Sequence, residues 1–262
     1  MFSKEHINYI KKIKKEKLLV RFFQILIIFI FLIGWQLLAD LNLINTFITS
    51  SPKKVIETII SLHQTGDLYK HIFVTIYETL FSFGLGTIIG FVIAMILWWN
   101  KFISKIVDPY LTIINSLPKV ALGPIIIIWG GAGTKSIIIM ALLISTIITI
   151  INVTDGFNST PASQIKLLKT FNATKSQIFK KLILPSSFKI IISALKINIS
   201  MSLIGVIMGE FLVSKAGLGY LIMYGSQVFN LNLVMTGIIL LCIISAILYY
   251  IVLYIEKKLV KN

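Results

Sequence analysis

Long apolar runs alternate with short polar segments along almost the whole chain of 262 residues. A transmembrane helix needs about 20 mostly apolar residues to cross the hydrocarbon core of a bilayer. Runs of about this length lie at residues 20–39, 72–99, 106–129, 136–153, 186–211 and 233–255. The pattern predicts an all-α, polytopic membrane protein with about six transmembrane helices in one membrane domain, residues 20–256.

Two segments are not predicted to form straight transmembrane helices. The third run contains Pro118, Gly123 and Pro124, and proline removes a helix hydrogen bond and clashes with the preceding turn. This predicts a kink or a break, which either lines a pathway or serves packing alone. Residues 212–232 are only moderately apolar, and they are interpreted as a partly re-entrant loop.

Small residues recur at four-residue spacing in two of the runs. They are Gly86, Gly90 and Ala94 in the second run, and Gly205 and Gly209 in the fifth. This spacing lets helices approach closely in lipid, where hydrophobic burial cannot drive their association. We therefore expect both runs to pack tightly against neighbouring helices.

A polar, basic island at residues 166–185 separates the fourth and fifth runs. Thr160, which a proline follows, is typical of a helix start. Asn172 tolerates the left-handed conformation that closes a helix, and Thr174-x-x-Gln177 matches the capping box that opens another. The island is therefore predicted to form two short helices broken at Asn172.

The first of these short helices carries apolar side chains although no bilayer is available to cover them. Leu167, Leu168 and Phe171 recur at helical spacing beside the polar Lys166. Burial of one such side chain contributes about 1.5–3 kcal/mol. A groove on a partner protein is therefore expected to receive this face.

Basic residues give the chain a formal net charge of +15 and are unevenly distributed. With the N-terminus inside, eighteen basic residues fall on that side of the membrane and five on the other, while two lie within spans. Segments rich in Lys and Arg stay in the cytoplasm. This predicts a cytoplasmic lead-in at residues 1–19, a cytoplasmic tail at 257–262 and a cytoplasmic basic island. No nucleic-acid motif accompanies the charge, which argues against a nucleic-acid partner.

Several short motifs follow one another in an order found in a known family. They are Gly66-Asp67-Leu68, Leu117-Pro118, Asn152-x-x-x-Gly156, Ile183-Leu184-Pro185, Glu210 and Gly217-Leu218-Gly219-Tyr220. Over residues 50–256 the chain resembles the permease subunits of ATP-binding-cassette (ABC) importers, in the nitrate/sulfonate/taurine branch. The family's Glu-Ala-Ala falls on Lys166, Leu167 and Leu168, and its glycine falls on Asn172. The spacing is thus kept while these residue types differ.

The resemblance implies a set of partners and a location. A homodimer or pair of permeases would form the substrate pathway in a bacterial cell membrane, with both termini cytoplasmic and lipid around the spans. Two cytoplasmic ATPase subunits and an extracellular or periplasmic substrate-binding protein would complete the importer.

Two sets of candidate site residues follow, one from the resemblance for the coupling loop and one from the kinked third run and the fifth run for the substrate pathway. Residues 157–185 correspond to the coupling loop, which docks on the ATPase. Its expected contact residues are Lys166, Leu167, Leu168, Phe171, Asn172, Ala173 and Thr174. The candidate pathway residues are Pro118, Ser200, Met201 and Glu210.

Placing an ionisable side chain within a membrane span costs free energy, so such a residue is a candidate for a functional role. Glu210 and Lys196 both fall in the fifth run, too far apart along one helix to touch. Glu210 is expected either to form a structural pair or hold a loop, or to take part in gating. His63 and His71 are interpreted as exterior surface residues.

Motifs for catalysis are missing from the sequence. The segment Gly130–Ser136, GGAGTKS, forms a predicted exterior turn and lacks the Gly-Lys-Ser/Thr order of a P-loop. No metal-protease or serine-hydrolase motif and no paired intramembrane carboxylates are evident, and Cys242 is the single cysteine. The chain is therefore predicted not to be an enzyme and to need no metal or cofactor, so that a partner subunit hydrolyses ATP.

The resemblance is compatible with several classes of substrate. A small anion such as a sulfonate, taurine or nitrate is expected, or a thiamine-precursor-like molecule. One alternative is the permease of a related amino-acid, methionine or phosphonate importer. An alternative of another class is an intramembrane enzyme.

Overall fold

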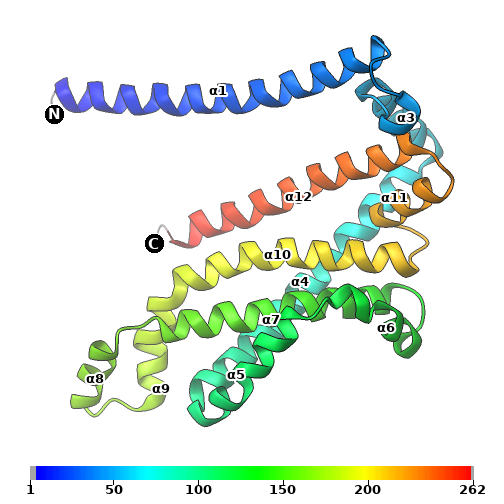
Figure 1. Cartoon of the computed structure of the whole chain (residues 1–262). Coiled ribbons are helices and arrows are strands. Elements are labelled where there is room, and N and C mark those ends of the chain that lie inside the picture. The colour runs from blue at the N-terminus through cyan, green and yellow to red at the C-terminus, as the bar shows by residue number, and fades with distance from the viewer. Residues whose placement is uncertain (1–3, 261–262) are drawn as a thin grey trace.

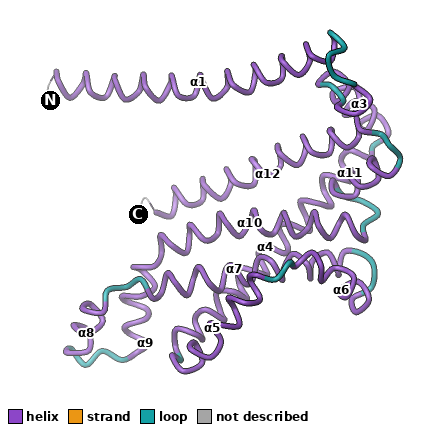
Figure 2. The backbone as a smooth tube through the Cα atoms, viewed as in Figure 1, coloured by secondary structure: helices purple, strands orange, loops and turns teal. Residues whose placement is uncertain are grey.

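The computed structural model describes residues 4–260, which form helices joined by short turns with no strand among them (Figure 1, Figure 2). The helices are α1 (Lys4–Asp40), α2 (Thr46–Thr49), α3 (Pro52–Thr65), α4 (Asp67–Trp99), α5 (Lys101–Ser116), the 3₁₀-helix η1 (Lys119–Leu122), α6 (Gly123–Gly130), α7 (Thr134–Asn158), α8 (Ala162–Thr170), α9 (Lys175–Ile178), the π-helix η2 (Phe179–Ile183), α10 (Leu184–Val213), α11 (Leu218–Gln227) and α12 (Leu231–Val260). The all-α class predicted from the hydrophobic pattern is confirmed.

Five helical segments are long and apolar enough to cross a membrane, and a bent pair makes a sixth if it is counted as one span. The five are Lys12–Asp40, Asp67–Trp99, Thr134–Asn158, Lys175–Val213 and Leu231–Lys258. The pair joins Lys101–Ser116 to Lys119–Gly130 with a bend of 87°. Leu117 is extended there, with φ −65° and ψ 139°, because the ring of Pro118 disfavours a helical residue before it. The predicted break in the third run is confirmed.

The N-terminal part of the chain is one long helix. α1 runs without a break from the predicted lead-in, residues 1–19, into the first span, so the two are continuous. None of the apolar window of α1 is buried within the chain, and Figure 1 shows α1 apart from the other spans along most of its length. Residues 1–3 of the lead-in and 261–262 of the predicted tail lie outside the described residues. The cytoplasmic position of both segments remains a prediction.

The centre of the bundle is formed by α4, α7 and α10, and glycines determine how closely these helices approach. A Cβ atom added at Gly90 would lie 2.6 Å from Cβ of Thr149 on α7. One added at Gly205 would lie 2.5 Å from Cα of Ala141, also on α7. No side chain fits at such distances, so α7 packs directly against the backbones of α4 and α10. The close packing predicted for the glycines of the second and fifth runs is confirmed.

We expect Gly205→Ala to destabilise the bundle, because the added methyl group meets the backbone of α7, which cannot move without displacing the helix. Overpacking of this kind costs about 1–3 kcal/mol. Gly84→Ala on α4 is the matched control, since nothing lies within 4 Å of the added Cβ there. Thermal unfolding of the two purified variants in detergent measures the difference. Equal midpoints would show that α7 and α10 are farther apart in the folded protein.

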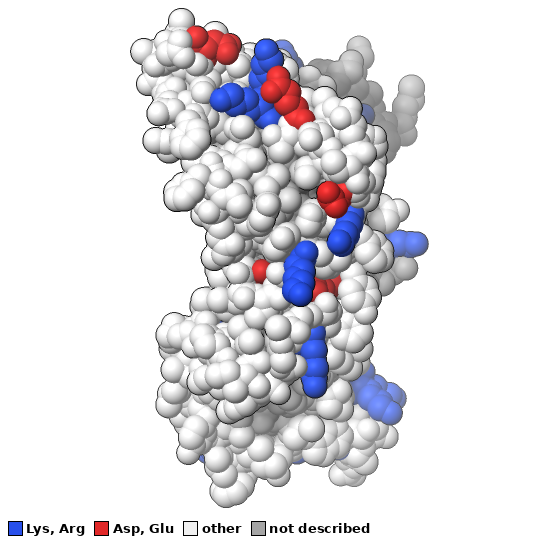
Figure 3. Space-filling model, turned by 90° about the vertical axis from the view of Figure 1, so that its right-hand side faces the viewer, with Lys and Arg blue, Asp and Glu red and all other residues white. Residues whose placement is uncertain are grey.

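The two ends of the bundle carry different elements. The start of α1, the end of α12 and the α8–α9 pair lie at one end, while α3, α6 and α11 lie at the other (Figure 1). Figure 3 looks onto the second end and shows Lys, Arg, Asp and Glu side chains scattered among uncharged residues. The described parts of the lead-in, the basic island and the tail, which were all predicted to be cytoplasmic, thus lie together at the first end.

Residues 212–232 contain a helix instead of the predicted re-entrant loop. α11 begins after Gly217, whose φ of +113° strongly favours glycine. Leu218 and Leu221 of α11 are buried in a cluster that includes Leu240 of α12. The loop part of this interpretation was wrong, because Leu218 and Leu221 share a face that α12 buries, while glycine and polar residues lower the hydropathy of the segment as a whole.

Candidate functional site

α8 and α9 form the helix pair predicted within the coupling loop (157–185). α8 ends at Thr170, and Asn172 has φ +54°, the left-handed conformation expected of a residue that closes a helix. Thr174 Oγ1 accepts a hydrogen bond from the backbone N–H of Gln177 at 3.3 Å, and Gln177 Oε1 accepts one from the Thr174 N–H at 2.8 Å. The predicted capping box is confirmed, and it fixes the start of α9.

Thr160 does not cap α8, contrary to the prediction from its position before a proline. No side chain caps the start of α8, where Pro161 is the N-cap residue. The Thr160 hydroxyl instead lies 2.8 Å from the hydroxyl of Ser186, near the start of α10. This contact ties the two ends of the coupling loop together, and local sequence spacing gives no sign of it.

The apolar residues predicted on α8 point in two directions. Leu167 is 56% exposed and Phe171 is 74% exposed, and we call these two side chains the docking face. Leu168 is half-buried and packs with Ala173 against a core cluster below the loop. Lys166 and the other contact candidates, Asn172 and Thr174, are exposed. The docking face is thus narrower than the three-residue face expected from helical spacing.

An aromatic cluster fixes the coupling loop to the membrane-spanning helices. The ring of Phe179 in η2 lies 4.9 Å from Trp98 of α4 and 5.3 Å from Phe157 of α7, measured between ring centroids. Ile178 and Ile183 are buried in the same cluster. Such aromatic pairs contribute about 0.5–1.5 kcal/mol each beyond the area that they bury. The segment from α9 to η2 is therefore packed against the ends of α4 and α7.

At the other end of the bundle, side chains from α4 and α10 hold the N-terminus of α11. Glu210 accepts hydrogen bonds from the Thr75 hydroxyl at 2.6 Å and from the Gly219 N–H at 2.5 Å. Thr75 also accepts a bond from the Leu218 N–H at 2.8 Å. The first N–H groups of a helix lack an intrahelical acceptor, and within a membrane they need a protein partner. Glu210 therefore has the loop-holding role that was one of its two predicted alternatives.

His71 belongs to the same group and is not the surface residue that was predicted. It is 7% exposed, its Nδ1 accepts a hydrogen bond from the Gly217 N–H at 3.0 Å, and its ring stacks on Tyr220. We call His71, Thr75 and Glu210 the α11 anchor. Sequence reasoning missed Thr75 and His71 because only the packing of α4 on α11 shows what they bind.

Glu78 of α4 is a second buried carboxyl group, one helical turn beyond Thr75 on the side of α4 that faces Glu210. This corrects the expectation that no paired intramembrane carboxylates are present. The Glu78 side chain is 1% exposed, and among the side chains that the structure describes neither of its carboxyl oxygens has a hydrogen-bond partner. Glu78 was not predicted as a site residue because it is isolated within an apolar run. Its proximity to α10 depends on the fold and has no sign in the sequence.

Lys196 pairs with a residue far from Glu210, in agreement with the spacing argument. Its Nζ lies 3.0 Å from a carboxyl oxygen of Glu256 on α12. The pair joins the first half of α10 to the last turns of α12. A structural role therefore accounts for this lysine.

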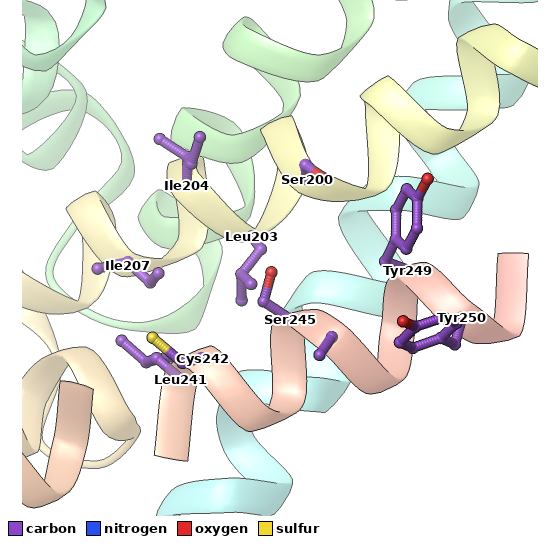
Figure 4. Close-up of a pocket in the computed structure, with 10 residues that line it drawn as sticks. Ser200, Leu203, Ile204, Ile207, Leu241, Cys242, Ser245, Tyr249 and Tyr250 are labelled. Atoms are coloured by element: carbon purple, nitrogen blue, oxygen red, sulfur yellow. The ribbon is translucent and has the colours of Figure 1, made fainter. Parts of the chain in front are cut away.

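An open cavity of about 610 Å³ lies between α10 and α12 (Figure 4). Ser200, Ser245 and the two tyrosines Tyr249 and Tyr250 bring hydroxyl groups to a wall that is otherwise mainly Leu and Ile. Such a mixture of an apolar wall and a few polar groups is typical of sites for small molecules.

The candidate pathway residues are not gathered at this cavity. Ser200 lines it, whereas Pro118, Met201 and Glu210 do not. Pro118 lies at the bend between α5 and α6, and Glu210 is 1% exposed within the α11 anchor. Across the part of the chain that the structure describes, no three His, Cys, Asp or Glu side chains are grouped to hold a metal ion.

Residues 86–261 match the family described as the binding-protein-dependent transport system inner membrane component. The match covers well over half of the chain, so the chain belongs to this family. It is an ABC importer permease. Relatives described as aliphatic sulfonate and taurine transport permeases place it in the sulfonate/taurine branch.

Three relatives illustrate the range of the similarity. An ABC transporter permease protein of Haemophilus influenzae is 30% identical over 226 residues, covering 86% of this chain and 91% of its own length. The aliphatic sulfonates transport permease protein SsuC of Bacillus subtilis is 26% identical, covering 87% and 82%. The formylaminopyrimidine transport permease protein ThiX of Halalkalibacterium halodurans is 28% identical, covering 66% and 69%.

A solved structure supports the fold. A chain of the MetNI methionine ABC transporter in an inward-facing conformation superposes with a TM-score of 0.66 and 19% identity. The alignment covers 76% of this chain and 96% of that chain. The arrangement of helices described above is thus that of an ABC transporter membrane subunit.

Proposed function

We propose that this permease carries a small sulfonate-like anion into a bacterial cell, driven by a separate ATPase that docks on the coupling loop. A second copy of the chain, or a paired permease, completes the pathway. A substrate-binding protein delivers the substrate at the end of the bundle that carries α3, α6 and α11. The family match supports these partners, and the lack of a P-loop in the sequence requires that ATP be hydrolysed elsewhere.

The exposure of the docking face is the observation that carries this proposal. Leu167 and Phe171 are the most exposed apolar side chains of α8 and the turn that follows it. Clusters of exposed aromatic and aliphatic side chains mark protein interaction sites. The aromatic cluster at Phe179 connects this surface to α4 and α7. Movement of a docked ATPase would therefore shift α4 and α7, and both of these helices pack on α10, which forms one wall of the cavity between α10 and α12.

The choice of substrate class rests on relatives and on the cavity between α10 and α12. Sulfonate permeases lie among the relatives, and the hydroxyl groups of Ser200 and Tyr249 could donate hydrogen bonds to a sulfonate. A formylaminopyrimidine is the second candidate, because a relative carries that description and the tyrosine rings could stack on a pyrimidine. Uptake competition between a sulfonate and a pyrimidine separates the two.

Reconstitution tests the proposed division of labour. Purified alone, the chain should neither bind nor hydrolyse ATP. Proteoliposomes that also contain the cognate ATPase and binding protein should accumulate the substrate only when ATP is supplied on the ATPase side. Robust ATP turnover by the chain without a copurifying ATPase would contradict the proposal.

Cysteine labelling tests the orientation. In a Cys242→Ser background, Ser176→Cys in α9 should react with an impermeant thiol reagent only from the cytoplasmic side. Thr65→Cys at the end of α3 should react only from outside, because the two positions lie at opposite ends of the bundle and both are exposed. Labelling of both cysteines from the same side would exclude the proposed topology.

A further inference from the structure

We propose that a cavity behind the coupling loop binds the phosphate headgroup of an anionic phospholipid. The cavity has a volume of about 560 Å³, within the range of roughly 300–1,000 Å³ typical of small-molecule sites. The ends of α4 and α7, the start of α5, and α8 and α9 enclose it. The proposal requires that this end of the bundle lies at a bilayer surface, and it does not depend on the ATPase or the transported substrate.

Three lysines from three helices line the cavity. They are Lys101 of α5, Lys169 of α8 and Lys175 of α9. Among the side chains that the structure describes, no Asp or Glu lines the cavity and none of the three lysines forms an ion pair. Like charges gathered from separate elements repel one another, and the attraction of an anion bound between them would offset that repulsion. The charge of the cavity therefore fits a phosphate group.

The tryptophan residues beside the cavity favour a lipid over a soluble anion. Trp98 lines the cavity, and Trp98 and Trp99 end the long apolar helix α4. Tryptophan is enriched where a membrane meets water. Lys175 Nζ lies 5.9 Å from the ring centroid of Trp98 and 5.7 Å from that of Trp99. The tryptophan pair thus holds a cation at the level of the headgroups.

The rest of the cavity wall fits the apolar part of a phospholipid. Phe157, Ile165 and Ile178 lie on the wall with the lysines. A free phosphate ion gains nothing from these side chains, whereas the first methylene groups of an acyl chain would be removed from water by them. Basic pockets between transmembrane helices on the cytoplasmic side are typical headgroup sites.

The cavity is separate from the docking face. Leu167 and Phe171 are exposed and do not line it, whereas Ile165, Lys169 and Ala173 do. A headgroup bound there would contact α5, α8 and α9 together. It would hold the coupling loop against the spans while leaving the docking face free.

Matched double variants test the site. Lys101→Gln with Lys169→Gln removes two charges that line the cavity. Lys105→Gln with Lys166→Gln removes two exposed charges from the same two helices, α5 and α8, outside the cavity. The delipidated full chain in detergent is titrated with phosphatidylglycerol, and bound lipid is counted by native mass spectrometry. Phosphatidylcholine and inorganic phosphate serve as comparison ligands.

We expect the cavity variant to bind phosphatidylglycerol about 30-fold more weakly, since each lysine near an anionic lipid contributes about a factor of five. The control variant should bind like the unmodified chain, phosphatidylcholine should bind weakly, and millimolar phosphate should not compete. Equal binding by the two double variants would overturn the proposal. So would equal binding of the two lipids. Displacement by millimolar phosphate would overturn the lipid as the source of the phosphate group.

Discussion

Replacing Phe171 with alanine is expected to abolish copurification of the ATPase and substrate uptake while the permease still inserts into the membrane. Phe171 is 74% exposed, and docking would bury it. Burial of such a side chain contributes about 1.5–3 kcal/mol, and aromatic anchors at the centre of an interface dominate binding. The spans are unchanged, so insertion should be normal. The amount of ATPase that copurifies with tagged permease, and uptake by the same cells, measure the effect.

Lys166→Gln is the matched control for this experiment. Lys166 lies near the docking face and is exposed, and a solvated charge of this kind contributes about 0–1 kcal/mol. It should weaken docking much less than Phe171→Ala. Full copurification with Phe171→Ala would show that the docking face binds elsewhere, for example flat on the membrane surface.

Replacing Glu210 with leucine is expected to lower the thermal stability of the permease and to eliminate uptake. The change removes the acceptor for the Thr75 hydroxyl and for the Gly219 N–H. Each buried group left without a partner costs about 1–3 kcal/mol. The N-terminus of α11 would lose its hold on α4 and α10. Thermal unfolding in detergent and uptake by cells are the measurements.

Glu210→Gln provides the control, since its amide oxygen retains one acceptor at the same place. It should keep more of the stability and uptake than the leucine variant. Unchanged unfolding of Glu210→Leu would mean that the α11 anchor contributes nothing to the fold. In that case the alternative role of Glu210 in gating would become the leading explanation.

The positions of the spans could be predicted from the sequence because lipid imposes a simple rule on length and polarity. The same holds for the break at Pro118 and for the glycine contacts on α7, since proline and glycine have strong local effects. α11 was not predicted, because it is short, glycines interrupt its sequence, and its burial depends on α12. Helices that pack on other helices by a narrow face leave little periodic signal.

The coupling loop was predictable in outline, and the other sites were not. Asn172 and the capping box act within a few residues, so their effects can be inferred locally. Leu168 points toward the bundle because it packs on the core cluster that includes Phe157 and Phe179, and this contact cannot be inferred locally. The α11 anchor and the Glu78–Glu210 pair join residues more than a hundred positions apart, and a single sequence has no feature that connects them.

Site-specific cross-linking is the most direct test of the central claim that the docking face contacts an ATPase. In the Cys242→Ser background, Leu167→Cys and Leu168→Cys are compared with a short bifunctional reagent in cells that express the complete importer. The exposed residue 167 is predicted to form an adduct with a protein that contains a P-loop, identified by mass spectrometry, while the inward-facing residue 168 is not. The absence of such an adduct at residue 167, in cells whose uptake is normal, would show that the docking face does not contact an ATPase.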